Sequence, residues 1–567
     1  MSTEVKEPKK ISRRKYIAIA GAAVAVVAVG GGYYILQQGQ TPTQTTSSTT
    51  TSSTTTSTQV PVKLGGNLNI GTYLQFAPAL DPSNTTTHAD IAVITPVYEP
   101  LIHYDDNLNL IPWLAESWKM SDDKLSLTFQ IRKGVKWQRI NRELTAEDVA
   151  YSIDRSSKWG LSKTFLLYIN STEVLDNYTA KINLSRPFPP LLEILANPGA
   201  RGGLMVPKLT DDELMKYGNI TREQYNTDGF RTFAIGTGPF TLEEVIRGQD
   251  AKYKKFEDYW GRDSDGRKLP YLDTMTELPQ EDSVVRLSNL KAKVIDIDYN
   301  IPAKDIGPMK QETDFTTGQI LGTITCMLDC NLLQDVMKIQ KVRNAIHLAI
   351  DKEEINNIAL KGFGEPMYAP VPSWDRYYYK VPGFEHNLEQ AKVLLKEAGY
   401  ENGFSGTMIV QGSGEQPDIA VTLKDQLAKV NINIDLKIMD ISTYTDVAKE
   451  GKAYILGIGL WNGKIEPFTS LGGFRLGAGG TGDRVAHIRA VYAAECDAWI
   501  EKLATAESGD QMKQVMIDFE TWWMTTAPHI PLVVSPMAHV WWNYVHNVQY
   551  KNTYQGVEFN YRSIWRE

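Results

Sequence analysis

The sequence is poor in cysteine, with three among 567 residues. Cys326 and Cys330 stand four residues apart, and in an extended strand that spacing covers about 13 Å, too far for the two to bridge each other. A disulfide would therefore need Cys496 with one of these two, and one thiol would stay free. The stretch RDSDG (262–266) resembles a calcium loop but lacks its first acid and its closing glutamate. We expect no metal site and no cofactor.

Short catalytic signatures are also missing. The chain contains no Gly-x-Ser-x-Gly, no His-Glu-x-x-His and no cysteine–histidine nucleophile pattern. The glycine turn GTGPF (236–240) is not followed by Gly-Lys-Ser/Thr, and no Walker motif is present, so neither a phosphate loop nor ATP hydrolysis is indicated. These absences argue against an enzyme. An exported hydrolase that needs only two carboxylates at a set separation stays open as an alternative.

Positive charge is scarce outside the N-terminus. The chain has 59 Lys and Arg against 67 Asp and Glu, and residues 1–59 hold six of the former and two of the latter. The remainder carries 53 basic and 65 acidic residues, a net charge of −12. Nucleic-acid binding depends on neutralising phosphates with Lys and Arg, so an acidic body argues against a nucleic-acid partner.

Long apolar runs are rare as well, and the clearest is Tyr16–Leu36. Its 21 residues span roughly 30 Å as a helix, enough to cross a bilayer. The basic segment 1–15 should stay in the cytoplasm, which leaves the body outside. SRRKYI (12–17) resembles a twin-arginine signal, and Ala23–Ala25 offers a cleavage site. We expect a retained membrane anchor over 16–36, with a cleaved signal as the alternative.

Serine and threonine dominate the next segment, residues 37–63. Sixteen of the 20 residues from Gln40 to Gln59 are Ser or Thr, a composition that buries no core and predicts a flexible stalk. Sequons of the Asn-x-Ser/Thr type follow in what we expect to be an exported glycoprotein. The predicted glycosylation sites are Asn84, Asn170, Asn177, Asn183 and Asn219.

Alternating polarity marks the clearest strand, from Leu125 to Arg132. The alternation places four apolar side chains on one face, those of Leu125, Leu127, Phe129 and Ile131. Asp122-Asp123 before the strand predicts a turn helped by Asx geometry. Residues 144–158 predict a helix with Thr145 as its N-cap and acidic residues at its positive end.

Three other stretches predict larger elements. Residues 88–107 predict a helix that ends near Pro100, followed by a strand. Residues 338–360 predict one periodic helical stretch, and residues 529–545 predict a pair of strands. The mixed order of helices and strands predicts two α/β lobes with several chain crossings.

Several motifs appear in one order along the chain: AESWKMSDDKLSLTFQIRKGVKW, LTAEDVAYSIDR, GTGPFTLEEV, FEDYWG, PYLDTM, VRNAIHLAIDKEEI, HNLEQAKVLLKEAGYENGF and APHIPLVV. In this order they resemble the extracytoplasmic solute-binding proteins of oligopeptide/dipeptide-type ABC importers, over about residues 64–567. The anchor and stalk resemble those of archaeal surface binding proteins. A single motif would be weak evidence for this resemblance, whereas the whole series in the same order is specific to the family.

The resemblance implies a two-lobed periplasmic-binding-protein-like α/β fold of class II, with an extra subdomain in the first lobe and a two-strand hinge. Carried over to this chain, lobe one covers 64–318 plus 540–567, and lobe two covers 319–539. The hinge crossings are expected near 319–324 and 535–540. The strand at 125–132 then belongs to the subdomain and its neighbouring sheet, where it holds shape.

The resemblance also implies a mechanism and partners. A small solute binds between the lobes outside the cell and favours the closed state by its differential affinity. The loaded protein, expected to be a monomer, then meets ABC permease subunits in the membrane, which a cytoplasmic ATPase drives. A structural or adhesive surface protein that keeps the fold without transport is the alternative.

Peptide-binding members of that family hold the peptide's ammonium group with an acid after a GW-like strand. The corresponding stretch, 459–468, has Gly463 or Lys464 there, and Glu466 matches an acid with a structural role. The basic residue for a dipeptide's carboxylate should lie in 410–418, where Gly412 and Ser413 occur instead. The stretch therefore lacks the charges that read peptide termini.

Oligosaccharide-binding members stack sugars on aromatic rings and bind hydroxyls with polar side chains. We therefore expect an oligosaccharide ahead of an oligopeptide, and the choice stays open. Trp541 and Trp542 are adjacent in a predicted strand, so at most one of them lines the cleft. The candidate ligand-binding residues are Trp461, Asn462, Lys464, Gln411, Gln75, Tyr73, Trp374, Tyr377 and Trp541.

Overall fold

The computed structural model describes residues 61–73, 80–84, 88–105, 107–160, 162–197, 202–227, 233–246, 248–462, 466–473, 486–507, 509–553 and 556–567. The chain divides into two units, 1–61 and 62–567, and the described residues belong to the second apart from Pro61. The predicted basic segment, the anchor and residues 37–60 of the stalk lie outside the described residues. Within the described ranges no helix is both long and apolar enough for a membrane span.

The strand predicted from alternating polarity is β5 (Ser126–Ile131), and it pairs with β4 (Ala115–Met120). Leu127, Phe129 and Ile131 are fully buried, as predicted, whereas Leu125 is 38% exposed because the strand begins one residue after it. The predicted Asx turn is confirmed, since Asp123 Oδ1 accepts a hydrogen bond from the backbone N–H of Leu125 at 3.0 Å.

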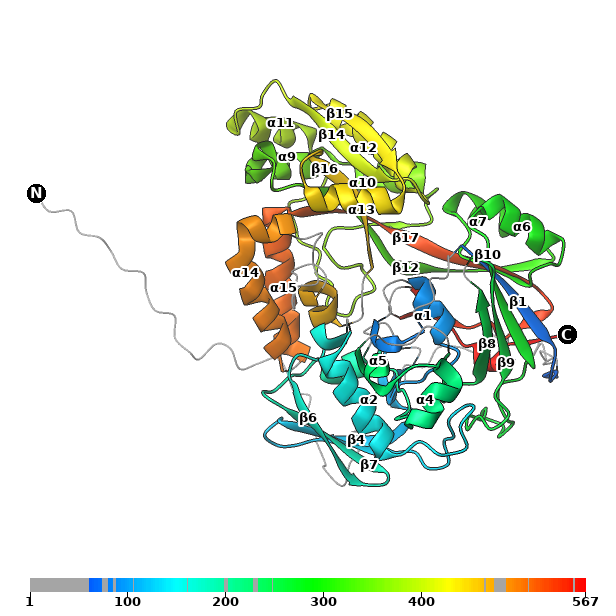
Figure 1. Cartoon of the computed structure of the whole chain (residues 1–567). Coiled ribbons are helices and arrows are strands. Elements are labelled where there is room, and N and C mark those ends of the chain that lie inside the picture. The colour runs from blue at the N-terminus through cyan, green and yellow to red at the C-terminus, as the bar shows by residue number, and fades with distance from the viewer. Residues whose placement is uncertain are drawn as a thin grey trace, which may run out of the picture. The chain divides into compact units, whose positions relative to one another are not determined.

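The hairpin belongs to a four-stranded antiparallel sheet, in the order β4-β5-β7-β6, at the bottom of Figure 1. Helix α2 (Ala146–Lys158) packs on this sheet and begins at the predicted cap, Thr145, whose N–H donates to Asp148 Oδ2 at 3.1 Å. The same carboxylate accepts from Trp137 Nε1 at 3.1 Å and from Arg142 Nη1 at 2.7 Å. Trp137 therefore ties the hairpin to the start of the helix.

The bounds of the remaining elements before residue 315 follow. They are β1 (Asn67–Thr72), α1 (His88–Ile94), β2 (Ile102–Tyr104), β3 (Leu110–Pro112), β6 (Ile169–Asp176), β7 (Thr179–Leu184), α3 (Leu191–Ala196), α4 (Asp211–Gly218), α5 (Arg222–Thr227), β8 (Phe240–Ile246), β9 (Asp250–Lys255), β10 (Thr274–Pro279), α6 (Ser283–Lys291), β11 (Ile297–Tyr299) and α7 (Ala303–Met309).

From residue 315 onward, strands and helices alternate and a hairpin stands near the C-terminus. The elements are β12 (Phe315–Cys330), α8 (Asp335–Lys338), α9 (Gln340–Ala349), α10 (Lys352–Ala359), β13 (Glu365–Pro366), α11 (Leu388–Glu397), β14 (Phe404–Gln411), α12 (Gln416–Ala428), β15 (Ile432–Met439), α13 (Ile441–Glu450), β16 (Leu456–Asn462), α14 (Ala486–Thr505), α15 (Gly509–Thr526), β17 (His529–Trp542), β18 (Val545–His546), β19 (Tyr550–Thr553), β20 (Gly556–Phe559) and β21 (Trp565–Arg566).

Two long strands connect the halves of the main sheet, whose order is β15-β14-β16-β12-β17-β11-β1-β10-β9-β8. Figure 1 shows β12 and β17 side by side, and they pair antiparallel from Phe315 to Asp329. The register shifts between Leu321 and Thr325, which interrupts the ladder where the hinge was predicted. The two-lobed α/β fold is thus built around a pair of crossing strands, while the predicted lobe boundaries stay predictions.

Three predicted elements differ from the structure. Helix α1 ends at Ile94, not near Pro100, because Pro96 disfavours helical backbone at the residue before it. The stretch 338–360 is not one helix: Asp351 begins α10 by accepting from the N–H of Glu354 at 3.0 Å. The predicted strand pair at 529–545 is a single strand, β17, whose Pro531 and Pro536 each adjoin a register shift.

The three cysteines are free and buried. Cys326 and Cys330 lie on β12, and Cys496 lies in α14. Burial raises the pKa of the Cys330 thiol to about 12 and that of Cys496 to about 11. The disulfide considered from the sequence is therefore absent from the described residues, and the thiols pack as small apolar groups.

Candidate ligand cavity

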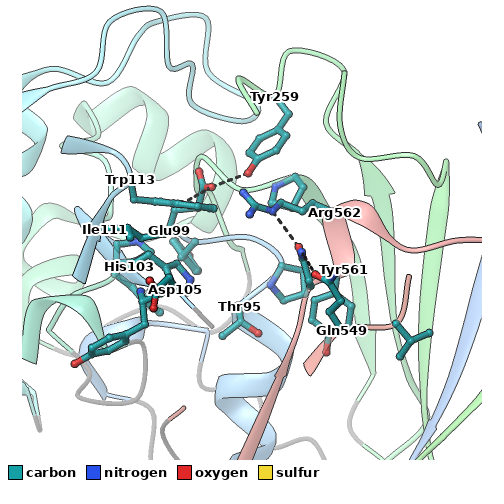
Figure 2. A pocket seen from close by; sticks show the side chains of 18 of the residues that line it. Thr95, Glu99, His103, Asp105, Ile111, Trp113, Tyr259, Gln549, Tyr561 and Arg562 are labelled. Carbon is teal, nitrogen blue, oxygen red and sulfur yellow. Dashed lines mark hydrogen bonds between the residues drawn. The ribbon is translucent and has the colours of Figure 1, made fainter. Parts of the chain in front are cut away.

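A cavity of about 700 Å³ lies against the two crossing strands. Ile320 of β12 and Trp541 of β17 reach it from the two long strands. Most of the remaining wall comes from residues 95–113 and from the C-terminal segment 548–562 (Figure 2), and Leu204, Pro239 and Tyr259 complete it. Its lining residues are Thr95, Pro96, Tyr98, Glu99, Pro100, His103, Tyr104, Asp105, Ile111, Trp113, Leu204, Pro239, Tyr259, Ile320, Trp541, Val548, Gln549, Asn560, Tyr561 and Arg562. The volume is in the range of sites for small ligands.

Glu99 is a buried carboxylate at this cavity, between α1 and β2. It accepts four hydrogen bonds, each of 2.9 Å, from Trp113 Nε1, Trp260 Nε1, the Tyr259 hydroxyl and the Thr237 hydroxyl. Burial raises its pKa, and these neutral donors oppose part of that rise. Among the described residues no lysine or arginine forms an ion pair with it. Neutral donors alone hold this carboxylate.

These donors explain two of the sequence motifs. Thr237 belongs to GTGPF, and Tyr259 and Trp260 belong to FEDYWG. Gly236, also of GTGPF, leaves no room for a side chain, because a Cβ there would lie 1.9 Å from the carbonyl oxygen of Val97. The motifs therefore fold against the segment that carries Glu99 and shape the cavity wall.

Among the described residues that line the cavity, Arg562 is the only arginine, and there is no lysine. Its guanidinium carbon lies 4.3 Å from the ring centroid of Trp113, and its Nε donates to Asn560 Oδ1 at 3.0 Å. Burial raises the pKa of Tyr259, and the nearby guanidinium opposes part of that rise. Figure 2 shows Arg562 close to Tyr259 and Trp113. The stack and the Asn560 bond hold the side chain in one orientation.

Aromatic side chains also gather where β1 and β11 end. The rings of Tyr73 and Tyr299 stack with centroids 6.2 Å apart, and Tyr299 lies 4.8 Å from His539 of β17. Burial raises the pKa of Tyr73 to about 12. Glu415, which precedes α12, accepts from the N–H of Ala303 at 3.2 Å. This contact joins the first turn of α7 to the predicted second lobe.

Side chains of the two predicted lobes also meet elsewhere. Arg186 forms two hydrogen bonds with the carboxylate of Glu501 in α14, at 2.7 and 2.8 Å. Arg376 Nη1 lies 3.2 Å from Glu193 Oε1 of α3. These ion pairs are partly exposed, so each contributes modestly by itself.

The predicted ligand-binding residues do not all lie together in the structure. Trp541 lines the cavity, and Trp542 points to the other face of β17, where its ring lies 4.4 Å from that of Phe315, as the alternation predicted. Trp374 donates to the carbonyl of Gly322 at 3.2 Å, beside the hinge.

The other predicted residues do not line this cavity or are not described. Tyr73, Gln411 and Tyr377 are half-buried and absent from its wall. The backbone of Trp461 and Asn462 pairs with β12 in strand β16, but their side chains lie outside the described residues, as do Gln75 and Lys464. Glu466, predicted to be structural, is buried and accepts from the N–H groups of Phe468 and Thr469 at 2.6 and 2.7 Å.

The predicted glycosylation sites differ in exposure. Asn170, Asn177 and Asn219 are exposed, and Asn84 and Asn183 are half-buried. Asn183 Nδ2 donates to the hydroxyl of Ser171 at 3.3 Å. Glycosylation itself stays a prediction.

Of the lining residues, sequence reasoning predicted Trp541 and missed the others, including Glu99, Trp113, Tyr259 and Arg562. One signal was present, because Glu99 stands alone as an acid in the apolar run PVYEPLI (96–102). A lone acid between residues as apolar as Tyr98 and Leu101 indicates a buried, hydrogen-bonded carboxylate. No comparable signal marks Arg562, which reaches the cavity from the far end of the chain.

The chain is similar in sequence to known proteins. Residues 109–482 match the family described as bacterial extracellular solute-binding proteins, family 5 Middle. The chain is 30% identical over 420 residues to the dipeptide-binding protein of Escherichia coli (strain K12), a match that covers 68% of this chain and 74% of that protein.

Two solved structures show a similar fold. The Helicobacter pylori periplasmic binding protein DppA in complex with the peptide STSA has a TM-score of 0.74 and 22% identity, covering 89% of this chain and 99% of that one. The oligopeptide-binding protein AppA of Bacillus subtilis with a nonapeptide has a TM-score of 0.72 and 23% identity, covering 89% and 100%.

Proposed function

The chain belongs to the bacterial extracellular solute-binding proteins of family 5, and from this premise we propose that it is the substrate-binding component of an ABC importer. Proteins of this family are transport binding proteins rather than enzymes. The observation that carries the proposal is the cavity beside the crossing strands, since Ile320 and Trp541 put both strands in its wall. By the predicted bounds the wall belongs to lobe one apart from Ile320, so a solute that fills the cavity contacts lobe one and the two hinge strands.

The mechanism follows from that contact. A solute shifts the equilibrium between open and closed lobes only by its difference in affinity for the two states. In this structure Arg186–Glu501 and Arg376–Glu193 join the predicted lobes, and closure would preserve these contacts. The solute and these ion pairs together favour closure, and loss of the solute returns the balance to the open state.

We propose that the solute is a short peptide. Three of the similar proteins support this choice, because one is a dipeptide-binding protein and two hold peptides in solved structures. The cavity mixes aromatic rings with amide and hydroxyl groups, which suits a peptide backbone as well as a sugar. The oligosaccharide predicted from the sequence stays an alternative and enters the test as such.

The protein would work outside the cytoplasm and deliver its solute to permease subunits in the membrane. The net negative body, the predicted anchor over 16–36 and the predicted stalk support a monomer tethered at the outer face of the cytoplasmic membrane. Transport energy would come from a separate ATPase.

A thermal-shift screen of the purified full chain tests the proposal. It compares a mixed library of free peptides with cello-, malto- and xylo-oligosaccharides. A ligand at about 1,000 times its Kd stabilises the folded state by roughly 4 kcal/mol, which raises the melting temperature. A shift with peptides supports the peptide choice, and a shift with one sugar series alone replaces it.

Matched variants locate the site. Trp541→Leu removes a ring from the cavity, whereas Trp542→Leu removes the neighbouring ring on the opposite face. Ligand affinity should fall in the first variant and stay near the wild-type value in the second. Binding of neither peptide nor sugar would favour a surface protein without transport.

A further inference from the structure

Strand β12 is interrupted where it passes between the predicted lobes. Its register with β17 shifts between Leu321 and Thr325, so that three residues of β12 stand opposite one residue of β17. Extra residues of this kind interrupt the ladder and let a strand bend. Gly322 begins the interrupted stretch and has no room for a side chain, because a Cβ there would lie 2.7 Å from Met537 Cγ. The break is therefore a place where the strand can bend although the two strands lie close together.

A side chain from outside the sheet holds this break. Trp374 Nε1 donates to the carbonyl oxygen of Gly322 at 3.2 Å. Trp374 belongs to the turn segment 372–378, which we call the strap. The indole thus supplies a hydrogen bond to a carbonyl that lies outside the paired register of β12 and β17.

The strap is held in shape by hydrogen bonds of its own. The N–H of Asp375 donates to the carbonyl of Pro372, and the N–H of Tyr378 donates to the carbonyl of Asp375, each at 3.0 Å. The N–H of Tyr377 donates to Asp375 Oδ1 at 2.8 Å. Consecutive turns built around one buried aspartate leave little freedom. The residues on either side of Asp375 therefore keep a fixed spacing.

The other end of the strap reaches the predicted first lobe. Arg376 Nη1 lies 3.2 Å from Glu193 Oε1, and Nη2 lies 3.5 Å from the carbonyl oxygen of Leu108. Each contact is one hydrogen bond away from the cavity wall. The hydroxyl of Tyr104 donates to the carbonyl of Glu193 at 3.1 Å, and the carbonyl of Asp105 accepts from the N–H of Leu108 at 3.1 Å. Tyr104 and Asp105 both line the cavity.

We propose that the strap couples contact between the lobes to bending of β12: Arg376 holds the strap against lobe one, and Trp374 holds the break in the strand. When the lobes separate, the Arg376–Glu193 pair is lost and the bond to Gly322 weakens, so the break becomes more mobile. Neither Arg376 nor Trp374 belongs to the described wall of the cavity, so both are positioning residues. The inference rests on the proposed function for the solute that drives closure, and it adds the device that links closure to the hinge.

Amide hydrogen exchange of the purified full chain without solute tests this coupling. In Arg376→Gln, the amides of 319–326 should exchange up to about 5-fold faster than in the wild type, the factor that loss of a partly exposed ion pair allows. Trp374→Phe removes the hydrogen bond and keeps a ring, and should speed exchange by up to about 10-fold. Arg376→Lys keeps the charge and should exchange at a rate between those of the wild type and Arg376→Gln.

A double variant and a control distinguish coupling from general loosening. If the strap acts as one unit, Trp374→Phe combined with Arg376→Gln exchanges no faster than the faster single variant, whereas independent effects multiply. Arg489→Gln removes an ion pair within the predicted second lobe and should leave exchange of 319–326 unchanged. Amides of α2 serve as the internal reference, and circular dichroism checks that each variant folds. Multiplied effects, or an unchanged rate in Arg376→Gln, would overturn the coupling.

Addition of the mixed peptide library separates this inference from the proposed function. Bound peptide should slow exchange of 319–326 in the wild type, and should slow it less in Arg376→Gln. Slowing by peptide together with an unchanged rate in solute-free Arg376→Gln overturns the strap and leaves the transport function standing. Faster exchange in Arg376→Gln without any slowing by peptides or by the three sugar series overturns the transport function and keeps the coupling.

Discussion

Arg343 of α9 is fully buried and forms no ion pair among the described residues, so its replacement gives a sharp test of the packing described here. Its Nε donates to the carbonyl of Thr526 at 2.8 Å, and Nη1 donates to those of Met337 and Lys338 at 2.7 and 3.0 Å. Nη2 donates to the Tyr492 hydroxyl at 2.6 Å. One guanidinium thus caps the C-terminal ends of α8 and α15.

Arg343→Met removes these donors and keeps the volume of the stem. Three backbone carbonyls then lose their partners, at about 1–3 kcal/mol each if they stay buried, and partial relaxation reduces the sum. We expect the free energy of unfolding to fall by about 3–5 kcal/mol. Arg343→Lys should lie between the variant and the wild type, since one ammonium cannot reach all four acceptors.

Urea unfolding followed by tryptophan fluorescence measures the loss as a lower midpoint at an unchanged slope. Arg489→Met is the matched control, because Arg489 pairs with Asp497 at 2.6 Å on the surface and should cost less than about 1 kcal/mol. A loss below about 1 kcal/mol in Arg343→Met, equal to that of the control, would refute the capping role.

Three further predictions test closure, titration and thiol state. Glu501→Gln removes the ion pair with Arg186. Calorimetry should show solute affinity reduced by up to about 5-fold at low salt and by less at high salt. A loss of affinity that does not depend on salt would contradict a role of this ion pair in closure. Burial, with the Asp375 carboxylate nearby, raises the pKa of Glu520 from 4.5 to about 9, so the folded state keeps a proton that the unfolded state releases. Wild-type stability should therefore fall relative to Glu520→Gln as the pH rises from about 4.5 to about 9, and parallel pH profiles would contradict this. Without reductant, thiol titration should find three reactive cysteines after unfolding and little reaction before it, and fewer than three would indicate a disulfide.

Local patterns predicted many single elements of the fold. The alternation after Leu125 gave β5, and Thr145 with its following acids gave the start of α2. Both signals are local, because a strand face or a helix cap depends on residues only a few positions apart. Two local predictions were wrong at prolines: Pro96 ends α1 before Pro100, and residues predicted as a pair of strands form the single strand β17, whose prolines lie beside register shifts.

The cavity was harder to predict than the fold. Trp541 lines the cavity, and its place on one face of a strand follows from local alternation, while its role in binding stays a prediction. The family pattern predicts a basic residue for a peptide's carboxylate within 410–418, whereas Arg562 reaches the cavity from the C-terminal segment. Glu99 and Arg562 meet through tertiary structure alone, and no periodicity in one sequence records such a contact.

The two long strands β12 and β17 also determine the order in which parts of the main sheet can form during synthesis. Strand β11 pairs with β17 through Ile297 and Trp541, and β1 lies beside β11, so the sheet formed by the first half of the chain waits for residues made near the end. Segment 319–539 is continuous, but β12 also pairs with β17, so its sheet is completed only when residues 529–534 have been made. The wall that carries Asn560 and Arg562 comes from residues made after this segment, so a nascent chain gains its binding cavity only after residue 562 has been synthesised.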